Sequence, residues 1–288
     1  MDLLYSRDTI YRPITEENSV FLEVQQGCSY GGCAFCDFGK DEYRVFSLDD
    51  IATKIHLLKE IYTDEKRMFL LGQNALALQR NYLEHIFKMV KKHMPNIEEF
   101  AMYGRADDVL RKNEADLKRL MNLGLKELHI GLESGSDEVL HQMNKKITRK
   151  EYQKAFHLLD KLDLDYSITI IPGLGGKEGR DDHIEMTAKM INEIHPKLIW
   201  ALDLYIWPGT KLKEMVERGE FQPMDPMEMA EEQIYLMDRI HKNEKCFYLN
   251  TTYMGFYTLF GELSRGKNRL YAMMMKLYRQ DEDIIIGR

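Results

Sequence analysis

The chain has 288 residues, of which 44% are hydrophobic, and a formal net charge of −7 at pH 7. This apolar content suffices for a buried core, and the length fits a single α/β barrel with a C-terminal extension. Because the net charge is negative, the chain has no general attraction to phosphate backbones, and we do not expect nucleic acid as a partner. The most apolar strand candidate, residues 198–207, is too short to cross a bilayer, so no membrane partner is expected either.

The cysteine usage indicates a reducing compartment. Four cysteines, three of them within nine residues, do not form the framework of a secreted disulfide protein. The N-terminus also lacks the basic and apolar regions of a signal peptide. We therefore expect a cytoplasmic protein.

Short strand-like segments alternate with helical segments after an arm of about fifteen residues, which predicts repeated βα units and a parallel sheet. The expected strands are residues 19–25, 67–71, 99–103, 127–132, 165–171 and 198–206. Six strands, in place of the eight of a closed barrel, predict a partial (β/α)6 TIM-like barrel. The predicted regions are an N-terminal arm over 1–15, the barrel over 16–220 and a C-terminal α/β extension over 221–288 that covers the barrel opening.

The helices carry recognisable start and stop signals. Two pairs have the spacing of a capping box, Ser47 with Asp50 and Thr148 with Glu151. Gly124 and Gly219 follow apolar helical patterns at the position where a left-handed residue ends a helix. In the extension we expect a helix over 226–241, a strand over 246–250 and a helix over 268–278. Its polar and aromatic residues would either cover the barrel opening or form a packing layer: Tyr248, Asn250, Thr252, Tyr253 and Tyr257.

Five predicted strands carry polar side chains on one face, although a parallel sheet covered on both faces normally reads as continuous apolar residues. Since side chains alternate along a strand, each of these sets shares a face. The sets are Glu23 with Gln25, Tyr103 with Arg105, His129 with Gly131 and Glu133, Ser167 with Thr169, and Asp203 with Tyr205. We infer that this face lines an open barrel that admits a large substrate or cofactor. The alternative is that some of these residues reach solvent at strand ends.

Cys28, Cys33 and Cys36 lie in one nine-residue segment, in which Gly31 and Gly32 permit a tight backbone turn. Three thiolates at this spacing can bind a four-iron cluster and leave one iron without a protein ligand. The alternatives are a structural zinc site and a disulfide. Structural zinc normally takes four ligands, and the remaining cysteine, Cys246, has no second ligand beside it. Cys246 is either a hydrogen-atom donor or a buried thiol.

The segment from Gly27 to Cys36, with Phe35 before the last cysteine and Asp37 and Phe38 after it, resembles the cluster loop of the radical S-adenosylmethionine (radical SAM) superfamily. The resemblance implies an oxygen-sensitive [4Fe–4S] cluster whose open iron chelates S-adenosylmethionine and cleaves it to a 5′-deoxyadenosyl radical. It also implies a flavodoxin- or ferredoxin-type electron donor. Four residues separate the first two cysteines here, where the commonest family spacing is three.

Further motifs follow in the order of that superfamily. Residues 71–75 occupy the place of its Gly-Gly-Glu motif, and residues 130–145 resemble the branch of coproporphyrinogen oxidases, elongator-type enzymes and methylthiotransferases. By this resemblance Glu133 would bind the ribose hydroxyls and Lys145 would pair with the methionine carboxylate. Residues 170–178 resemble the segment that packs against adenine, and residues 207–210 close the sixth strand as in the same branch.

The sequence therefore predicts a radical SAM enzyme, of oxidoreductase, lyase or isomerase type, that abstracts hydrogen from an unidentified small-molecule substrate. The alternative is a non-catalytic iron–sulfur or metal-carrier protein on the same barrel. The predicted cofactor contacts are Phe35, Gly72, Gln73, Asn74, Arg105, Glu133, Ser134, Lys145, Thr169, Pro172 and Gly173. The candidate catalytic residues are Asp203, Tyr205 and His129.

Overall fold

The computed structural model describes residues 4–6, 10–38 and 41–286, so residues 1–3 and 7–9 of the predicted arm lie outside the described residues. The chain forms two compact units. Unit 1 comprises Met1–Gly31, Phe38–Ile130 and Lys161–Tyr166. Unit 2 comprises Gly32–Asp37, Gly131–Asp160 and Ser167–Arg288.

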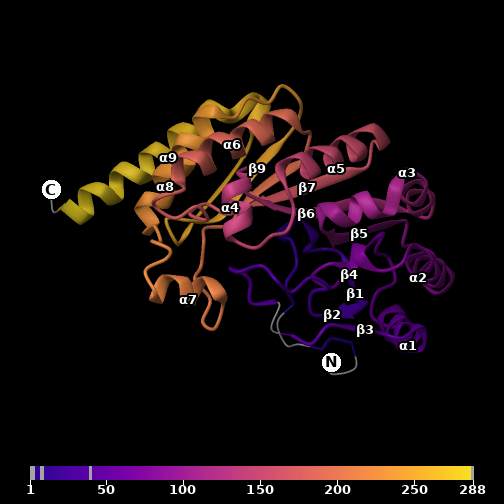
Figure 1. The fold of residues 1–288 in the computed structure, drawn as a ribbon. Coiled ribbons are helices and arrows are strands. Elements are labelled where there is room, and N and C mark those ends of the chain that lie inside the picture. Colours follow the sequence, from indigo (N-terminus) through magenta and orange to yellow (C-terminus); the bar gives the residue numbers. More distant parts are fainter. Residues whose placement is uncertain (1–3, 7–9, 39–40, 287–288) are drawn as a thin grey trace. The chain divides into compact units, whose positions relative to one another are not determined.

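Unit 1 is built on parallel strands in the order β1, β4, β5, β6. These strands are β1 (Val20–Glu23), β4 (Arg67–Leu71), β5 (Glu99–Gly104) and β6 (Leu125–Glu133), whose last three residues belong to unit 2. The helices between them are α1 (Leu48–Lys59), α2 (Arg80–His93) and α3 (Ala106–Asn122) (Figure 1). Shorter elements are η1 (Ile14–Glu16), η3 (Ala75–Ala77) and the antiparallel pair β2 (Gln25–Gln26) and β3 (Arg44–Val45).

Both faces of the unit 1 strands are covered. On one face α2 packs on β5, where the ring of Phe87 stacks on that of Phe100 with centroids 3.9 Å apart. On the other face Phe69, Leu71 and Ala101 form an apolar cluster with residues of the N-terminal segment, including Tyr5 and Ile10. The N-terminal segment therefore removes the apolar residues of one strand face from water, as the helices do on the opposite face.

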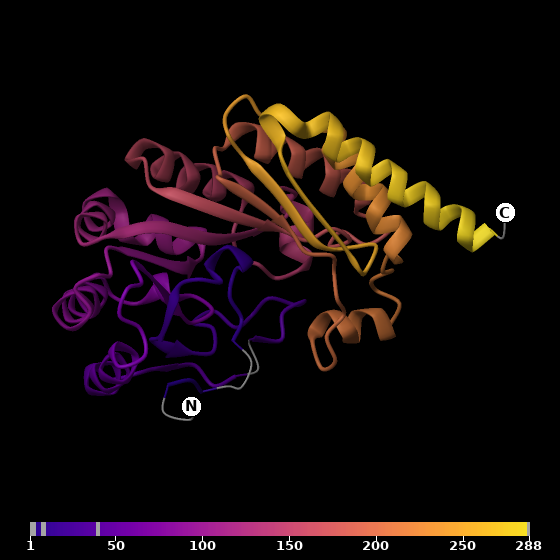
Figure 2. The same cartoon turned by 180° about the vertical axis from the view of Figure 1, so that it is seen from behind.

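Unit 2 holds β7 (Asp165–Ile170), whose first two residues belong to unit 1, then β8 (Leu198–Ala201) and β9 (Phe247–Tyr253), which pair in parallel. β10 (Tyr257–Glu262) returns antiparallel to β9. The helices are α4 (Asp137–Gln142), α5 (Arg149–Leu162), α6 (Arg180–Glu193), α7 (Lys211–Glu217), α8 (Pro226–Arg239) and α9 (Leu263–Ile286). Figure 2 shows α9 lying along the β9–β10 hairpin, where it also packs on α8.

The local signals in the sequence are confirmed. Ser47 and Asp50 form the predicted capping box of α1, and Thr148 and Glu151 exchange the corresponding hydrogen bonds at the start of α5. Gly124 and Gly219 adopt φ values of +109° and +72° just after α3 and α7. These residues end their helices because glycine alone adopts such angles without steric cost.

The prediction of a strand over residues 198–206 is wrong at its C-terminal end, because β8 ends at Ala201. The N–H groups of Leu202 and Leu204 still donate to the carbonyls of Ile170 and Pro172, so the chain follows β7 without forming a regular strand. The strand predicted over 246–250 is the longer β9, β10 follows it, and the terminal helix starts earlier than predicted.

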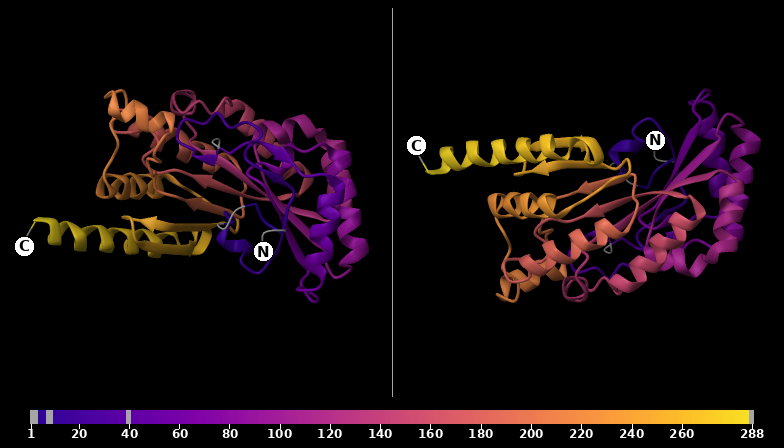
Figure 3. Two further views of the ribbon diagram at one scale, coloured as in Figure 1. Left: turned by 90° about the horizontal axis from the view of Figure 1, so that it is seen from below. Right: turned by 90° about the horizontal axis from the view of Figure 1, so that it is seen from above.

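No helix among the described residues has the length and apolar character of a membrane span. Figure 3 shows the helices and strands of each unit from below and from above.

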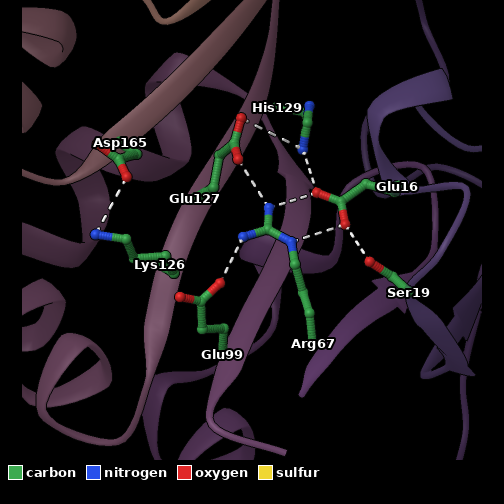
Figure 4. Close-up of polar contacts among 8 residues, drawn as sticks. All are labelled: Glu16, Ser19, Arg67, Glu99, Lys126, Glu127, His129 and Asp165. Carbon is green, nitrogen blue, oxygen red and sulfur yellow. Dashed lines mark hydrogen bonds and ion pairs between the residues drawn. The ribbon is translucent and has the colours of Figure 1, made fainter. Parts of the chain in front are cut away.

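A buried ionic cluster ties the N-terminal segment to the strands of unit 1 (Figure 4). The guanidinium of Arg67, on β4, lies 2.5 Å from the carboxylate of Glu16, 2.7 Å from that of Glu127 and 3.1 Å from that of Glu99. Nε2 of His129 is 3.0 Å from Glu16, whose side chain is 1% exposed. Burial raises the pKa of Glu16, but hydrogen bonds from Arg67 and His129 outweigh it and lower this pKa to about 2.

Replacing the cation of this cluster should destabilise the fold. Arg67→Met leaves the Glu16 carboxylate buried without its countercharge, and we expect the free energy of unfolding in urea to fall by about 3–5 kcal/mol. The matched control is Lys66→Met, which removes an exposed pair 3.9 Å from Glu98 and should cost less than about 1 kcal/mol. Equal losses in the two variants would contradict the role of Arg67.

The same cluster predicts the sign of the acid response. The pKa of Glu16 is about 2 in the folded protein against an ordinary value of 4.5, so its stabilisation is complete above pH 4.5 and is lost as the pH falls through 2. Arg67→Met should therefore flatten the dependence of the unfolding free energy on pH in this range.

Candidate functional site

The cysteine segment is local in sequence but contributes to both units, with Cys28 in unit 1 and Cys33 and Cys36 in unit 2. All four cysteines of the chain are described, and they form no disulfide. The thiols of the segment are partly exposed. Gly27 has φ +69°, and a Cβ there would lie 2.9 Å from the backbone oxygens of residues 41 and 42, so only glycine fits before Cys28.

The second half of the segment is held by backbone contacts within unit 2. Ala34 donates from its N–H to the carbonyl of Met143 and accepts at its own carbonyl from the N–H of Leu212, each at 2.9 Å. Asn144 donates from Nδ2 to the carbonyl of Gly32 at 2.6 Å. The turn after α4 and the start of α7 thus position Cys33 and Cys36.

In unit 1 the predicted residue Asn74 positions the first half of the segment. Its buried Nδ2 donates to Oγ of Ser29 at 2.8 Å and to a carboxylate oxygen of Asp108 at 2.7 Å. Oδ1 accepts from the backbone N–H of Arg105 at 3.1 Å. Both the donor and the acceptor of this amide are therefore engaged within the protein.

Three further predicted residues of unit 1 have other surroundings. The guanidinium of Arg105 lies 4.2 Å from the ring centroid of Tyr30, and its Nε donates to Asp107 at 2.9 Å. Gly72 has φ +143° and lies against the side chain of Gln25. Gln73, between Gly72 and Asn74, is partly buried.

Unit 2 gathers four of the predicted cofactor contacts around the end of β6. Glu133 accepts from Nζ of Lys145 at one carboxylate oxygen and from Oγ1 of Thr169 at the other, both at 2.9 Å. The side chains of Glu133 and Lys145 are 11% and 7% exposed. Nζ of Lys145 also lies 5.8 Å from the ring centroid of Phe35. The ends of β6 and β7 therefore meet at this carboxylate, and Phe35 of the cysteine segment lies near its lysine partner.

The backbone at this point is strained. Glu133 has φ +64°, a left-handed conformation that costs free energy for a residue other than glycine and that persists mainly at functional sites. A Cβ at Gly131 would lie 2.1 Å from Oε1 of Glu133 and 3.1 Å from Nζ of Lys145. The pair therefore requires glycine at position 131.

Two buried residues that the sequence analysis missed support the neighbouring contacts. Nδ1 of His183, on α6, lies 2.8 Å from Oγ of the predicted residue Ser134. Oε1 of Glu232, on α8, accepts from the N–H of the predicted residue Gly173 at 2.8 Å and lies 3.6 Å from Nε2 of His183. Pro172 precedes Gly173, and its carbonyl accepts from the N–H of Leu204 at 2.9 Å. The sequence marks His183 and Glu232 only as titratable residues at inward positions of their helices.

The candidate catalytic residues have separate surroundings. Oδ1 of Asp203 accepts from Gln233 at 2.9 Å and from Asn250 at 3.1 Å, and burial raises the pKa of Asp203 to about 6. Tyr205, by contrast, is 61% exposed, with its ring beside that of Trp207. Within unit 2, Asp203 lies under α8 and Tyr205 lies at the surface.

His129 belongs to the ionic cluster of unit 1. Ligand atoms of His129, Glu16 and Glu127 lie within 4.8 Å of one another, close enough to share a metal ion. The guanidinium of Arg67 already contacts both carboxylates, so it supplies the positive charge that a metal would supply. We therefore assign no metal to this cluster.

The residues of the extension are largely buried. Tyr248 and Asn250 contact Gln233 of α8, and the hydroxyl of Tyr253 donates to the carbonyl of Met274 at 3.2 Å. Thr252 accepts at Oγ1 from the N–H of Asp203, whereas Tyr257 is partly exposed on β10. Burial raises the pKa of the Cys246 thiol to about 12, so this thiol stays protonated at neutral pH.

The buried carboxyl of Glu232 predicts a pH response. Burial raises its pKa from 4.5 to about 8, so its contribution to stability is complete below pH 4.5 and is lost as the pH rises through 8. As the pH rises from 4.5 to 8, Glu232→Gln should therefore become more stable relative to the wild type. The measurement is the difference between their free energies of unfolding in urea. Glu231→Gln, at the neighbouring carboxylate of α8, controls for substitution on this helix. A difference between Glu232→Gln and wild type that does not change with pH would contradict the assignment.

Comparisons with known proteins identify the family and the fold of the chain. The sequence profile of the Radical SAM superfamily matches residues 22–191, more than half of the chain. The tRNA-2-methylthio-N(6)-dimethylallyladenosine synthase of Ehrlichia chaffeensis is 24% identical over 240 residues, which cover 80% of this chain and 52% of that protein. The synthase of the same name from Sulfurihydrogenibium is 27% identical over 216 residues, covering 70% and 47%. The chain thus spans about half the length of these curated relatives.

Solved structures resemble the fold. Coproporphyrinogen III oxidase (HemN) from Escherichia coli has a TM-score of 0.59 at 14% identity, covering 77% of this chain and 52% of that one. The Elp3 protein of Methanocaldococcus infernus has a TM-score of 0.54 at 17% identity, covering 95% and 64%. These similarities confirm the predicted α/β fold of the partial barrel type. The chain belongs to the radical SAM superfamily of enzymes, whose cofactors are a [4Fe–4S] cluster and S-adenosylmethionine.

Proposed function

We propose that the protein binds a [4Fe–4S] cluster through Cys28, Cys33 and Cys36 and uses it to cleave S-adenosylmethionine reductively, for hydrogen abstraction from a substrate. The observation that carries this proposal is the strained Glu133, whose carboxylate is held by Lys145 and Thr169 at the end of β6. The donor set fits the cluster, because three thiols outside any disulfide lie in one segment and are partly exposed.

The roles of the unit 2 residues follow from their chemistry. A carboxylate accepts hydrogen bonds from two adjacent hydroxyls, so Glu133 is suited to the ribose of the nucleoside. Lys145 lies beside Glu133 and carries the charge that would attract the methionine carboxylate, as a point charge without the fixed fork of an arginine. Thr169 holds Glu133 in place, and the backbone of Pro172 and Gly173 would border the adenine.

For the substrate we propose a small molecule, because the net charge of −7 gives no general attraction to nucleic acid. A second candidate is an adenosine of tRNA, favoured by the similarity to synthases whose names state a modified adenosine of tRNA. An electron donor of the flavodoxin or ferredoxin type would reduce the cluster in either case. To distinguish the two candidate substrates, a low-molecular-mass cell extract and purified tRNA are each tested for stimulation of S-adenosylmethionine cleavage.

Cysteine substitutions test the proposed function. After anaerobic reconstitution we expect about four iron atoms per chain and slow release of 5′-deoxyadenosine under a strong reductant. Cys28→Ala, Cys33→Ala and Cys36→Ala should each lose the cluster and the release of 5′-deoxyadenosine. The matched control is Cys246→Ala, which should retain both, since this buried thiol lies outside the segment.

Two results would contradict the proposal. Cysteine variants that keep the iron content and the 5′-deoxyadenosine release of the wild type would show that the segment does not bind the cluster. A wild-type cluster that neither responds to S-adenosylmethionine nor releases 5′-deoxyadenosine would favour a non-catalytic iron–sulfur or metal carrier.

A further inference from the structure

Gln25 is a buried residue whose side-chain polar atoms have no hydrogen-bond partner in the described part of the chain. It lies in β2, three positions before Cys28, and is 1% exposed. Neither Nε2 nor Oε1 of its side chain has a hydrogen-bond partner among the residues that the structure describes. A buried amide without partners costs free energy, so a group outside the protein is expected to satisfy it.

The chain makes room for this amide. Gly72 has φ +143°, and a Cβ at Gly72 would lie 2.2 Å from Cγ and 2.9 Å from Cδ of Gln25. Any other residue at position 72 would therefore displace the Gln25 side chain. Gly72 follows β4 directly, at the carboxyl end of a parallel strand, where barrel enzymes bind their ligands.

A second buried glutamine shows that unused amides are not general in this protein. Gln233, also 1% exposed, donates from Nε2 to Asp203 and accepts at Oε1 from Tyr248 and Asn250. Its amide is fully engaged within unit 2. Gln25 therefore differs from Gln233 in its partners and not in its burial.

The chemistry of the amide identifies the ligand group. A carboxamide offers an acceptor oxygen beside a donor nitrogen, and the α-amino group and α-carboxylate of an amino acid supply a donor beside an acceptor. We propose that Gln25 binds the amino-acid end of S-adenosylmethionine, with Oε1 accepting from an N–H of the amino group and Nε2 donating to the carboxylate. This inference rests on the proposed function, which brings that end of the molecule to the cluster bound by Cys28.

The test compares two ligands on the reconstituted protein, without substrate, by calorimetry under anaerobic conditions. S-adenosylhomocysteine carries the amino-acid end, and 5′-methylthioadenosine has the nucleoside without it. Gln25→Met should weaken S-adenosylhomocysteine about tenfold or more, the loss expected for hydrogen bonds to charged groups, and leave 5′-methylthioadenosine unchanged. No substrate is present in this experiment. If Gln25 instead binds the amino-acid group of a substrate, Gln25→Met should leave the affinities for both ligands unchanged, and that result would overturn the proposal.

Stability in the absence of ligand separates binding from a structural role. Gln25→Met removes polar atoms for which the described residues supply no partner, so the urea midpoint should stay the same or rise. The matched control, Gln233→Met, leaves Asp203, Tyr248 and Asn250 without a partner and should lower that midpoint. Gln25→Glu is a second variant that keeps an acceptor and places negative charge near the ligand carboxylate, and it should also weaken S-adenosylhomocysteine selectively.

The outcomes are distinct. Equal weakening of both ligands by Gln25→Met, or a loss of midpoint like that of Gln233→Met, would overturn the role of Gln25 and leave the proposed function standing. A wild-type protein that binds neither ligand would overturn the proposed function, and this inference with it.

Discussion

The constraint on which the site depends is the position of one carboxylate at the end of β6. Glu133 is held in a left-handed conformation while its two oxygens accept from Lys145 and Thr169. Such an angle costs free energy for a residue other than glycine, and the surroundings of Glu133 hold it there. Here they are a lysine from the turn after α4, a threonine from β7 and a glycine at position 131 that leaves room for the pair. The strain is thus compensated by contacts that also fix the site.

Unit 1 uses buried amides in two opposite ways. Asn74 has every hydrogen-bonding atom engaged, and it joins the cysteine segment at Ser29 to Asp108 of α3. Gln25 is equally buried and has no described partner. An amide whose hydrogen bonds are all made within the protein stiffens the structure, whereas a buried amide without partners is able to form new hydrogen bonds to a ligand. This difference separates the residues that build the site from those suited to bind within it.

Sequence reasoning predicted what depends on local pattern. The strands of the barrel, both capping boxes and the glycines that end α3 and α7 follow from periodicity and turn chemistry within a few residues. It misplaced the end of β8, where the apolar pattern continues after the strand pairing becomes irregular. It also missed His183 and Glu232, because contacts to Ser134 and Gly173 across 49 and 59 residues are set by the fold and not by local sequence.

The most direct measurement is the affinity of the reconstituted protein for S-adenosylmethionine when the Glu133 carboxylate is replaced by an amide. Glu133→Gln keeps the shape of the side chain but exchanges one acceptor oxygen for a donor, so the account predicts binding at least about tenfold weaker. Glu138→Gln, at an exposed position of α4, should bind as the wild type does. An unchanged affinity of Glu133→Gln would contradict the claim that this carboxylate receives the nucleoside.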